Sequence, residues 1–188
     1  MNKRGSWVLW VSIGILIVLI VGIFLYFALW KPNYDKVYAA KVYSGALFNP
    51  VGNLSNEEAL LKFDESFVYY LLYEIKAYNL HNPPLSGNKP KIGFFIGEDP
   101  YNAVINNGDI LVSKGVIDSK DAIITTTKEE AIKMLRDKEY IKTSFSSGTS
   151  KIELIASKSI LFAKGYLNLY SELTGKGVTG NVVKIYLD

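Results

Sequence analysis

The sequence predicts an α+β protein with a single N-terminal transmembrane helix followed by one antiparallel-sheet domain that is covered by helices. Three observations lead to this fold class. An uncharged, apolar run covers residues 7–30. Apolar residues recur at steps of three and four over 56–80 and 159–173, which is typical of amphipathic helices. Between these stretches lie short apolar runs, two of which flank Asn107-Gly108, a strong hairpin signal.

The apolar run at 7–30 is long enough to cross a bilayer. About 20 helical residues cross a hydrocarbon core of about 30 Å, and the run exceeds the length of a signal-peptide core. Lys3 and Arg4 precede it, so residues 1–6 are predicted to lie in the cytoplasm and the domain outside the cell. We therefore expect a single-pass protein of the cell membrane, with the lipid bilayer as a partner through 7–30. A prepilin-like leader, suggested by Lys3-Arg4-Gly5, remains the alternative.

Composition excludes several kinds of site. The chain carries a net charge of +3, of which Lys3 and Arg4 supply +2, so only +1 remains for the rest and no nucleic-acid partner is expected. There is no cysteine, which excludes disulfides, thiolate chemistry and cysteine-ligated zinc. His81 is the single histidine and has no partner histidine. We therefore expect no metal site and no cofactor.

The segment after the anchor divides into an arm and a domain. Residues 31–54 contain several prolines and glycines and are predicted to form a stalk or extended arm, and 55–188 form the domain. Ser55-x-x-Glu58 is a capping box that predicts the start of the 56–80 helix. Asn53-Leu54-Ser55 also matches the N-glycosylation triplet, so Asn53 is a weak candidate for a glycan.

The remaining elements follow from turn and capping signals. Thr127, with Glu130 three residues later, predicts the start of another helix, and Gly148 is predicted to end the one after it. The predicted strands are 91–97, 101–105, 110–114, 121–127, 151–157 and 182–187, and the predicted helices in this part are 128–137, 139–145 and 159–173.

The 159–173 stretch carries more apolar surface than one core-facing stripe requires. Its only charged residues are Lys164 and Glu172. Two readings stay open: the second row lines a cavity, or the helix is buried on all sides. The two apolar rows are Ile160, Ala163, Leu167 and Tyr170, and Phe162, Tyr166, Leu169 and Leu173.

No constellation in the sequence predicts catalysis. Adjacent acidic residues such as Glu129 and Glu130 do not share a helix face, so they serve better as solvated or capping charges than as an acid–base pair. Ser86-x-x-Lys89 has the spacing of a serine–lysine pair, but it lies in a loop after Pro83-Pro84 and lacks an orienting third group. We expect a protein that is not an enzyme.

The order of elements from Lys91 to Leu173 resembles the sterol carrier protein family, whose members are non-catalytic lipid-binding domains. The resemblance rests on a strand, a hairpin, a strand that opens with an aspartate, a helix with an acidic start, a Phe-x-x-Gly turn, a strand and a closing apolar helix. The helix at 56–80 resembles the leading helix of the family. Where the family has a glycine after the strand at 151–157, this chain has Ala156-Ser157. The segments that carry the resemblance are Lys91–Gly97, Asn107-Gly108, Asp121–Thr125, Thr127–Leu135, Phe145–Gly148, Lys151–Ser157 and Ser159–Leu173.

The resemblance implies an apolar tunnel between the sheet and the helices that holds a lipid or fatty-acyl ligand. The first hypothesis is therefore a membrane-anchored, non-catalytic module for a lipid or another hydrophobic ligand. The alternative is a structural or interaction subunit of a membrane or cell-surface complex, with a filled core and no ligand. The residues predicted to line the tunnel are Phe162, Tyr166, Leu169, Leu173, Phe67 and Leu71.

Overall fold

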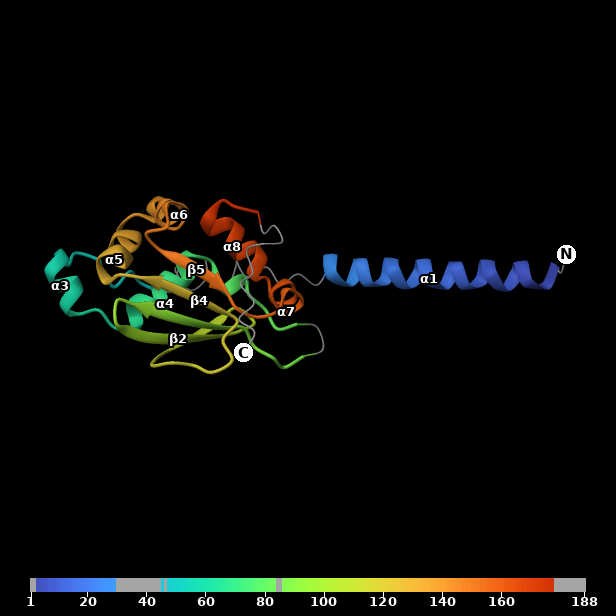
Figure 1. Ribbon diagram of the computed structural model, residues 1–188, viewed down its shortest axis with the longest axis horizontal. Coiled ribbons are helices and arrows are strands. Elements are labelled where there is room, and N and C mark those ends of the chain that lie inside the picture. Colours follow the sequence, from blue (N-terminus) through green and yellow to red (C-terminus); the bar gives the residue numbers. More distant parts are fainter. Residues whose placement is uncertain (1–2, 30–44, 46, 84–85, 178–188) are drawn as a thin grey trace. The chain divides into compact units, whose positions relative to one another are not determined.

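The computed structural model describes residues 3–29, 45, 47–83 and 86–177, and within the first of these ranges it describes the side chains of residues 10–23 (Figure 1). Along the chain, the first helices are followed by four consecutive strands, two helices, a fifth strand and two closing helices. The helices are α1 (Lys3–Leu29), α3 (Asn56–Leu61), α4 (Glu65–Glu74), the 3-10 turn η1 (Ala77–Asn79), α5 (Lys128–Arg136), α6 (Lys138–Ser147), α7 (Lys158–Ala163) and α8 (Tyr166–Thr174). The strands are β1 (Lys91–Ile96), β2 (Asp99–Asn106), β3 (Asp109–Lys114), β4 (Ala122–Thr126) and β5 (Lys151–Leu154).

The strands form one five-stranded sheet in the order β3-β2-β1-β4-β5. The predicted hairpin is confirmed: β2 and β3 are antiparallel, with Asn106 opposite Asp109 across the Asn107-Gly108 turn. The prediction of an antiparallel sheet is wrong, because β1 and β4 run parallel, with Ile92 opposite Ala122. The sheet is therefore mixed, although its other three strand pairs are antiparallel.

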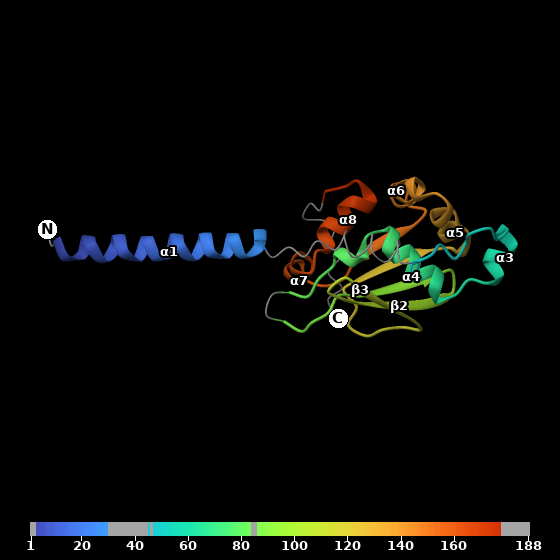
Figure 2. The ribbon, with the colours of Figure 1, turned by 180° about the vertical axis from the view of Figure 1, so that it is seen from behind.

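The parallel pair requires the chain to return from the end of β3 to the opposite end of the sheet before β4. Residues 115–121 make this return without a helix, passing over β2 and β1. In both ribbon views α5, α6 and α8 lie on one side of the sheet and this crossover lies on the other (Figures 1 and 2). One face of the sheet is thus the inner, helix-covered face and the other is the outer face.

The predicted 56–80 helix is wrong as a single element, because it consists of α3, α4 and η1. The predicted capping box of α3 is present, with the Ser55 side chain accepting from the Glu58 backbone and the reverse bond also formed. Asp64 then starts a new helix by accepting from the Ser66 N–H, and Lys76 takes a left-handed conformation at φ 59° that ends the helical run before η1. A local side-chain cap at Asp64 therefore overrides the apolar periodicity.

The predicted 159–173 helix is also broken, at Gly165. Gly165 has φ 85°, a conformation that glycine adopts without the steric cost of a Cβ atom. The left-handed Gly165 thus separates α7 from α8. By contrast, Thr127 caps α5 and Gly148 ends α6 with φ 85°, as the sequence predicts.

One hydrophobic core joins the inner face of the sheet to the helices. Ile92, Phe94 and Ile96 of β1 are fully buried, as are Leu72 of α4 and Met134 of α5. The same core includes residues of the arm predicted at 31–54: Leu47 and Val51 are 5% and 1% exposed. The described part of that arm therefore packs on the domain. The strand predicted at 182–187 lies outside the described residues.

Within the part of the chain that the structure describes, no helix is both long and apolar enough to cross a membrane. This finding overturns the transmembrane helix predicted at 7–30, the bilayer partner, and the single-pass localisation with a cytoplasmic N-terminus. Helix α1 runs from Lys3 to Leu29, and its side chains are described from Trp10 to Ile23.

The chain divides into two compact units, Met1–Asn33 and Tyr34–Asp188. The first contains α1, whose described apolar side chains are exposed. The second contains the sheet and all the other described helices. The candidate site described next lies entirely in the second unit.

Candidate functional site

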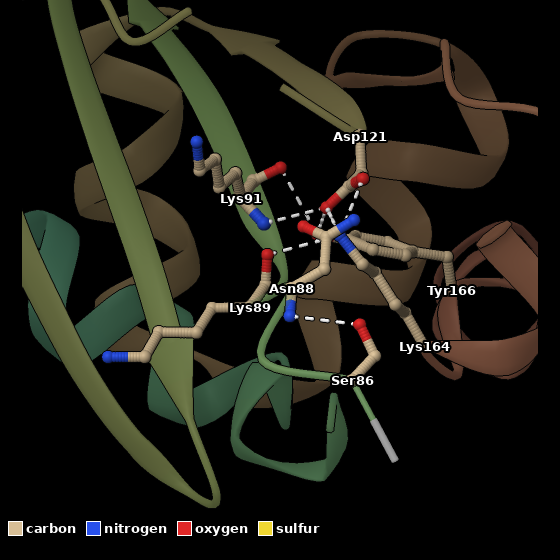
Figure 3. A network of polar contacts seen from close by, with 7 residues as sticks. All are labelled: Ser86, Asn88, Lys89, Lys91, Asp121, Lys164 and Tyr166. Atoms are coloured by element: carbon tan, nitrogen blue, oxygen red, sulfur yellow. Dashed lines mark hydrogen bonds and ion pairs between the residues drawn. The ribbon is translucent and has the colours of Figure 1, made fainter. Parts of the chain in front are cut away.

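A buried ion pair lies where the junction of α7 and α8 meets the sheet. Lys164 is the last residue before Gly165, Asp121 immediately precedes β4, and Tyr166 is the first residue of α8. These residues are 1%, 4% and 0% exposed, respectively. We call the group of Lys164, Asp121 and Tyr166 the polar hub (Figure 3).

The ammonium group of Lys164 donates to acceptors on three residues of the protein. Its Nζ lies 2.9 Å from Oδ1 and 2.8 Å from Oδ2 of Asp121. It also lies 3.1 Å from Asn88 Oδ1 and 3.0 Å from the Lys89 carbonyl oxygen. A buried ammonium needs such partners, because removing an ion from water costs several kcal/mol that attraction and hydrogen bonds must offset.

Asp121 also connects the neighbouring strands. Its Oδ2 accepts the Lys91 backbone N–H at 2.8 Å, and its carbonyl accepts the N–H groups of Ile155 and Ala156 beyond β5. The Tyr166 hydroxyl lies 3.2 Å from the same Oδ2 and 3.1 Å from the Lys91 carbonyl. Burial raises the pKa of Tyr166 well above its usual value, and the negative charge of Asp121 adds to the effect, so the phenol stays protonated and donates.

The polar hub fits an anchor rather than a reactive centre. Lys164 is held by three protein partners and Asp121 by three donors, so neither presents an unused atom to a substrate. Through these bonds the hub joins the 86–91 segment, the start of β4, the end of β5 and the junction of α7 and α8. It therefore fixes the base of α8 on the sheet.

Helix α7 extends from this anchor as a short apolar element with sequence Lys-Ser-Ile-Leu-Phe-Ala. Leu161 is fully buried, whereas the ring of Phe162 is 76% exposed. At Gly165 a Cβ atom would lie 3.4 Å from Cε1 of His81, so His81 packs directly against the junction. We call α7 the flap: it is a six-residue helix that buries Leu161 in the core and exposes the ring of Phe162.

The structure separates Phe162 from the other residues that were predicted to line a tunnel. Phe162 lies on the surface. Tyr166, Leu169 and Leu173 of α8 and Phe67 and Leu71 of α4 all belong to the hydrophobic core. Each of the two apolar rows of the sequence is thus divided between α7 and α8. Lining of a ligand cavity by these residues stays a prediction.

A second buried polar cluster, the hydroxyl cluster, lies between β4, α5, α6 and β5. Ser144 Oγ donates to Glu130 Oε1 at 2.8 Å and lies 2.7 Å from Ser150 Oγ, which in turn lies 2.8 Å from Thr126 Oγ1. Burial raises the pKa of Glu130, but hydrogen bonds from Ser144 and Tyr140 and the nearby Lys133 outweigh it and hold the pKa below its usual value. The carboxylate of Glu130 is therefore ionised and hydrogen-bonded, and the cluster links β4, α5, α6 and β5 inside the domain.

The loop residues considered for catalysis border the polar hub but do not form a serine–lysine pair. Ser86 Oγ accepts the Asn88 backbone N–H at 3.1 Å, and no hydrogen bond joins Ser86 to Lys89 in the part of the chain that the structure describes. His81 Nδ1 lies 3.2 Å from the Asn79 carbonyl. Across the described ranges, no group of three or more His, Asp or Glu residues could hold a metal ion. Asn53, the candidate for glycosylation, is exposed.

Sequence reasoning did not identify the polar hub. The available signals were a lysine in an otherwise apolar stretch and an aspartate that opens an apolar strand. A lone lysine in such a stretch is either exposed or paired, and burial cannot be deduced from periodicity. The two residues are 43 positions apart, so their pairing depends on the tertiary fold.

No family model and no curated protein matches the sequence. Among solved structures, a double mutant of the sec-alkyl sulfatase PisA1 is 13% identical with a TM-score of 0.39, and covers 69% of this chain and 18% of its own. The inverting sec-alkylsulfatase Pisa1 from Pseudomonas sp. is 13% identical with a TM-score of 0.36, and covers 64% and 18%. This chain thus spans less than a fifth of the sulfatase chain.

Sterol Carrier Protein 2 Like 2 from Aedes aegypti is also similar in structure. It is 16% identical with a TM-score of 0.30, and the match covers 52% of this chain and 92% of that one. This similarity assigns no family to the chain.

Proposed function

We propose that the domain is a non-catalytic module that binds a lipid or another hydrophobic ligand at the flap formed by α7. The observation that carries this proposal is the exposed ring of Phe162 on a short apolar helix that is joined to α8 by Gly165. A large apolar side chain at such a position offers contact area to an apolar partner.

The arrangement around the flap supports binding rather than chemistry. The polar hub fixes one end of α7, and the following helix, α8, carries buried apolar side chains, of which Tyr166 and Leu169 are 0% and 5% exposed. An acyl chain that inserts beside Leu161 would meet apolar surface. The titratable groups of the polar hub, Lys164, Asp121 and Tyr166, already form hydrogen bonds with one another.

The alternative is a structural or interaction module with a filled core and no ligand. The deep burial of five of the six predicted lining residues favours this reading. In that case Phe162 would contact another protein, because an exposed ring serves a protein interface equally well. Ligand binding by the isolated chain separates the two.

The test is titration of the full chain with a fluorescent long-chain fatty acid. We expect Phe162→Ser to weaken binding about 10-fold or more, since burying one large apolar side chain contributes about 1.5–3 kcal/mol. Phe48→Ser is the matched control, because Phe48 is also exposed, at 68%, and lies far from α7 in sequence. Both variants retain α1, so any contribution of that helix to probe binding is common to them.

Urea unfolding of both variants shows whether the fold is retained. Equal unfolding midpoints with a loss of binding only in Phe162→Ser support the proposal. Absence of probe binding by the parent, or equal losses in the two variants, would favour the structural alternative.

A further inference from the structure

The outer face of the sheet carries apolar side chains that no described helix covers. Val104 of β2 is opposite Leu111 of β3, and Gly93 of β1 is opposite Ile123 of β4, so these residues form adjacent rows on one face. Leu111 is 69% exposed, and Val104 and Ile123 are partly exposed. The face is therefore more apolar than a purely solvent-facing surface requires.

The crossover 115–121 covers only part of this face. At its start, Asn102 Nδ2 on β2 donates to the Gly115 carbonyl at 3.1 Å. At its end, the aliphatic stem of Lys120 lies over Gly93, where a Cβ atom would be 2.9 Å from the Lys120 Cδ atom. A flexible lysine stem thus fills the space that the missing side chain leaves, as lysines do when they cover apolar surface.

Three lysines gather at the end of this face where β1 and β4 begin. Lys89 and Lys91 precede and open β1, and Lys120 immediately precedes Asp121, whose N–H donates to the Lys91 carbonyl. In the described residues, none of the three takes part in an ion pair. Figure 3 shows the ammonium groups of Lys89 and Lys91 directed away from Asp121.

The acidic groups nearby leave this end of the face positive. Asp121 is committed to Lys164 inside the domain. Asp118, on the crossover, and Glu153, opposite Ile123 on β5, are exposed carboxylates, so the three lysines (+3) face two negative charges (−2) and a net charge of +1 remains. An apolar floor with unpaired ammonium groups at one end is complementary to a molecule with an apolar chain and one anionic head.

We propose that the outer face binds a free long-chain fatty acid. The chain lies over Gly93, Val104 and Ile123 once the Lys120 stem moves aside, and the carboxylate lies between Lys91 and Lys120. This site is separate from the flap at α7, so it does not depend on the function proposed above.

The test compares a fatty acid with a fatty alcohol of equal length, both titrated into the full chain. Gly93→Val fills the floor and displaces only the far end of a flexible side chain, so we expect both probes to lose at least 10-fold in affinity at this site. Lys120→Gln should weaken the fatty acid about threefold to fivefold and leave the alcohol unchanged, the effect expected for one partly exposed charge. Lys151→Gln, on β5 of the same sheet, is the matched control.

The outcomes separate this site from the flap. Loss of binding in Gly93→Val, with Phe162→Ser unaffected, supports the outer-face site even where the flap binds nothing. Loss in Phe162→Ser alone, with Gly93→Val and Lys120→Gln unchanged, overturns it. If the two outer-face variants lose affinity only for vesicles of anionic lipid and the parent binds no free fatty acid, the lysines serve a lipid surface and the proposal is likewise overturned.

Discussion

At the scale of single residues, the domain depends on charges that the fold hides completely. Lys164 and Asp121 are both almost fully buried, and each supplies most of the electrostatic compensation for the other. Replacing only one member of such a pair leaves an uncompensated ion in a poorly solvating interior. The hub is therefore a place where a single substitution has a large effect.

We expect Lys164→Met to reduce the free energy of unfolding by about 3–5 kcal/mol, the usual cost of breaking a buried pair. Asp121→Asn should be destabilising for the same reason, since it leaves the Lys164 ammonium without its carboxylate. The double variant should lose less than the sum of the two, as expected for a directly coupled pair. Urea unfolding of the full chain measures all three, with Lys142→Met, an exposed lysine of α6, as the control. Strict additivity of the two losses would contradict direct coupling.

The hydroxyl cluster makes a contribution to the free energy of unfolding that depends on pH. Because the pKa of folded Glu130 lies below the ordinary value of 4.5, the stability that its ionised form provides is present above pH 4.5 and is lost as the pH falls through the folded pKa. Ser144→Ala removes one hydrogen bond to this carboxylate, and we expect a loss of about 1.5–3 kcal/mol at pH 7 that shrinks below pH 4.5. Unfolding at several pH values checks this, with Ser146→Ala, an exposed serine of α6, as the control. A penalty that is equal at pH 7 and pH 3 would show that the loss does not come from the charged state of Glu130.

At the scale of elements, local signals predicted where elements begin better than how far they continue. The capping box at Ser55, the cap at Thr127 and the Asn107-Gly108 hairpin are all present, because each is decided within four residues. The predictions of two long helices are wrong at Asp64 and Gly165, where a side-chain cap and a left-handed glycine interrupt a continuous apolar pattern. Periodicity reports burial and not continuity, so it cannot reveal such breaks.

The strand pairing could not be deduced from the same signals. The hairpin fixes β2 against β3 locally, but β1 finds β4 only after the crossover at 115–121 has carried the chain across the sheet. Parallel neighbouring strands are usually joined by a longer crossover that contains a helix, and without a helix between β3 and β4 the sequence favoured an antiparallel sheet. The hydrogen bond from Asn102 to the Gly115 carbonyl holds the crossover against β2. It can form only once the chain has turned back over the sheet.

At the scale of the whole molecule, the candidate site and the arm are both held by contacts between residues that are far apart in the sequence. Lys164 reaches Asn88 and Lys89 as well as Asp121, and Asn49 of the arm donates to the Leu135 carbonyl of α5. Arg136 of the same helix donates to the Leu54 carbonyl. These ties explain why the described part of the arm belongs to the domain, which composition alone did not show.

The division into two compact units leads to the last prediction. The unit Tyr34–Asp188 contains the polar hub, the hydroxyl cluster and the whole hydrophobic core, so its stability should come from its own contacts. We expect a fragment that starts at Tyr34 to unfold in urea with the same midpoint and the same slope as the full chain, followed by the fluorescence of its tyrosines. A second fragment that starts at Ser55 is the control, because it lacks Leu47, Val51 and the bond from Asn49 to α5, and it should be less stable by about 2–5 kcal/mol, the range for loss of large buried side chains. A lower midpoint for the fragment from Tyr34 would show that residues 1–33 contribute to the fold of the domain.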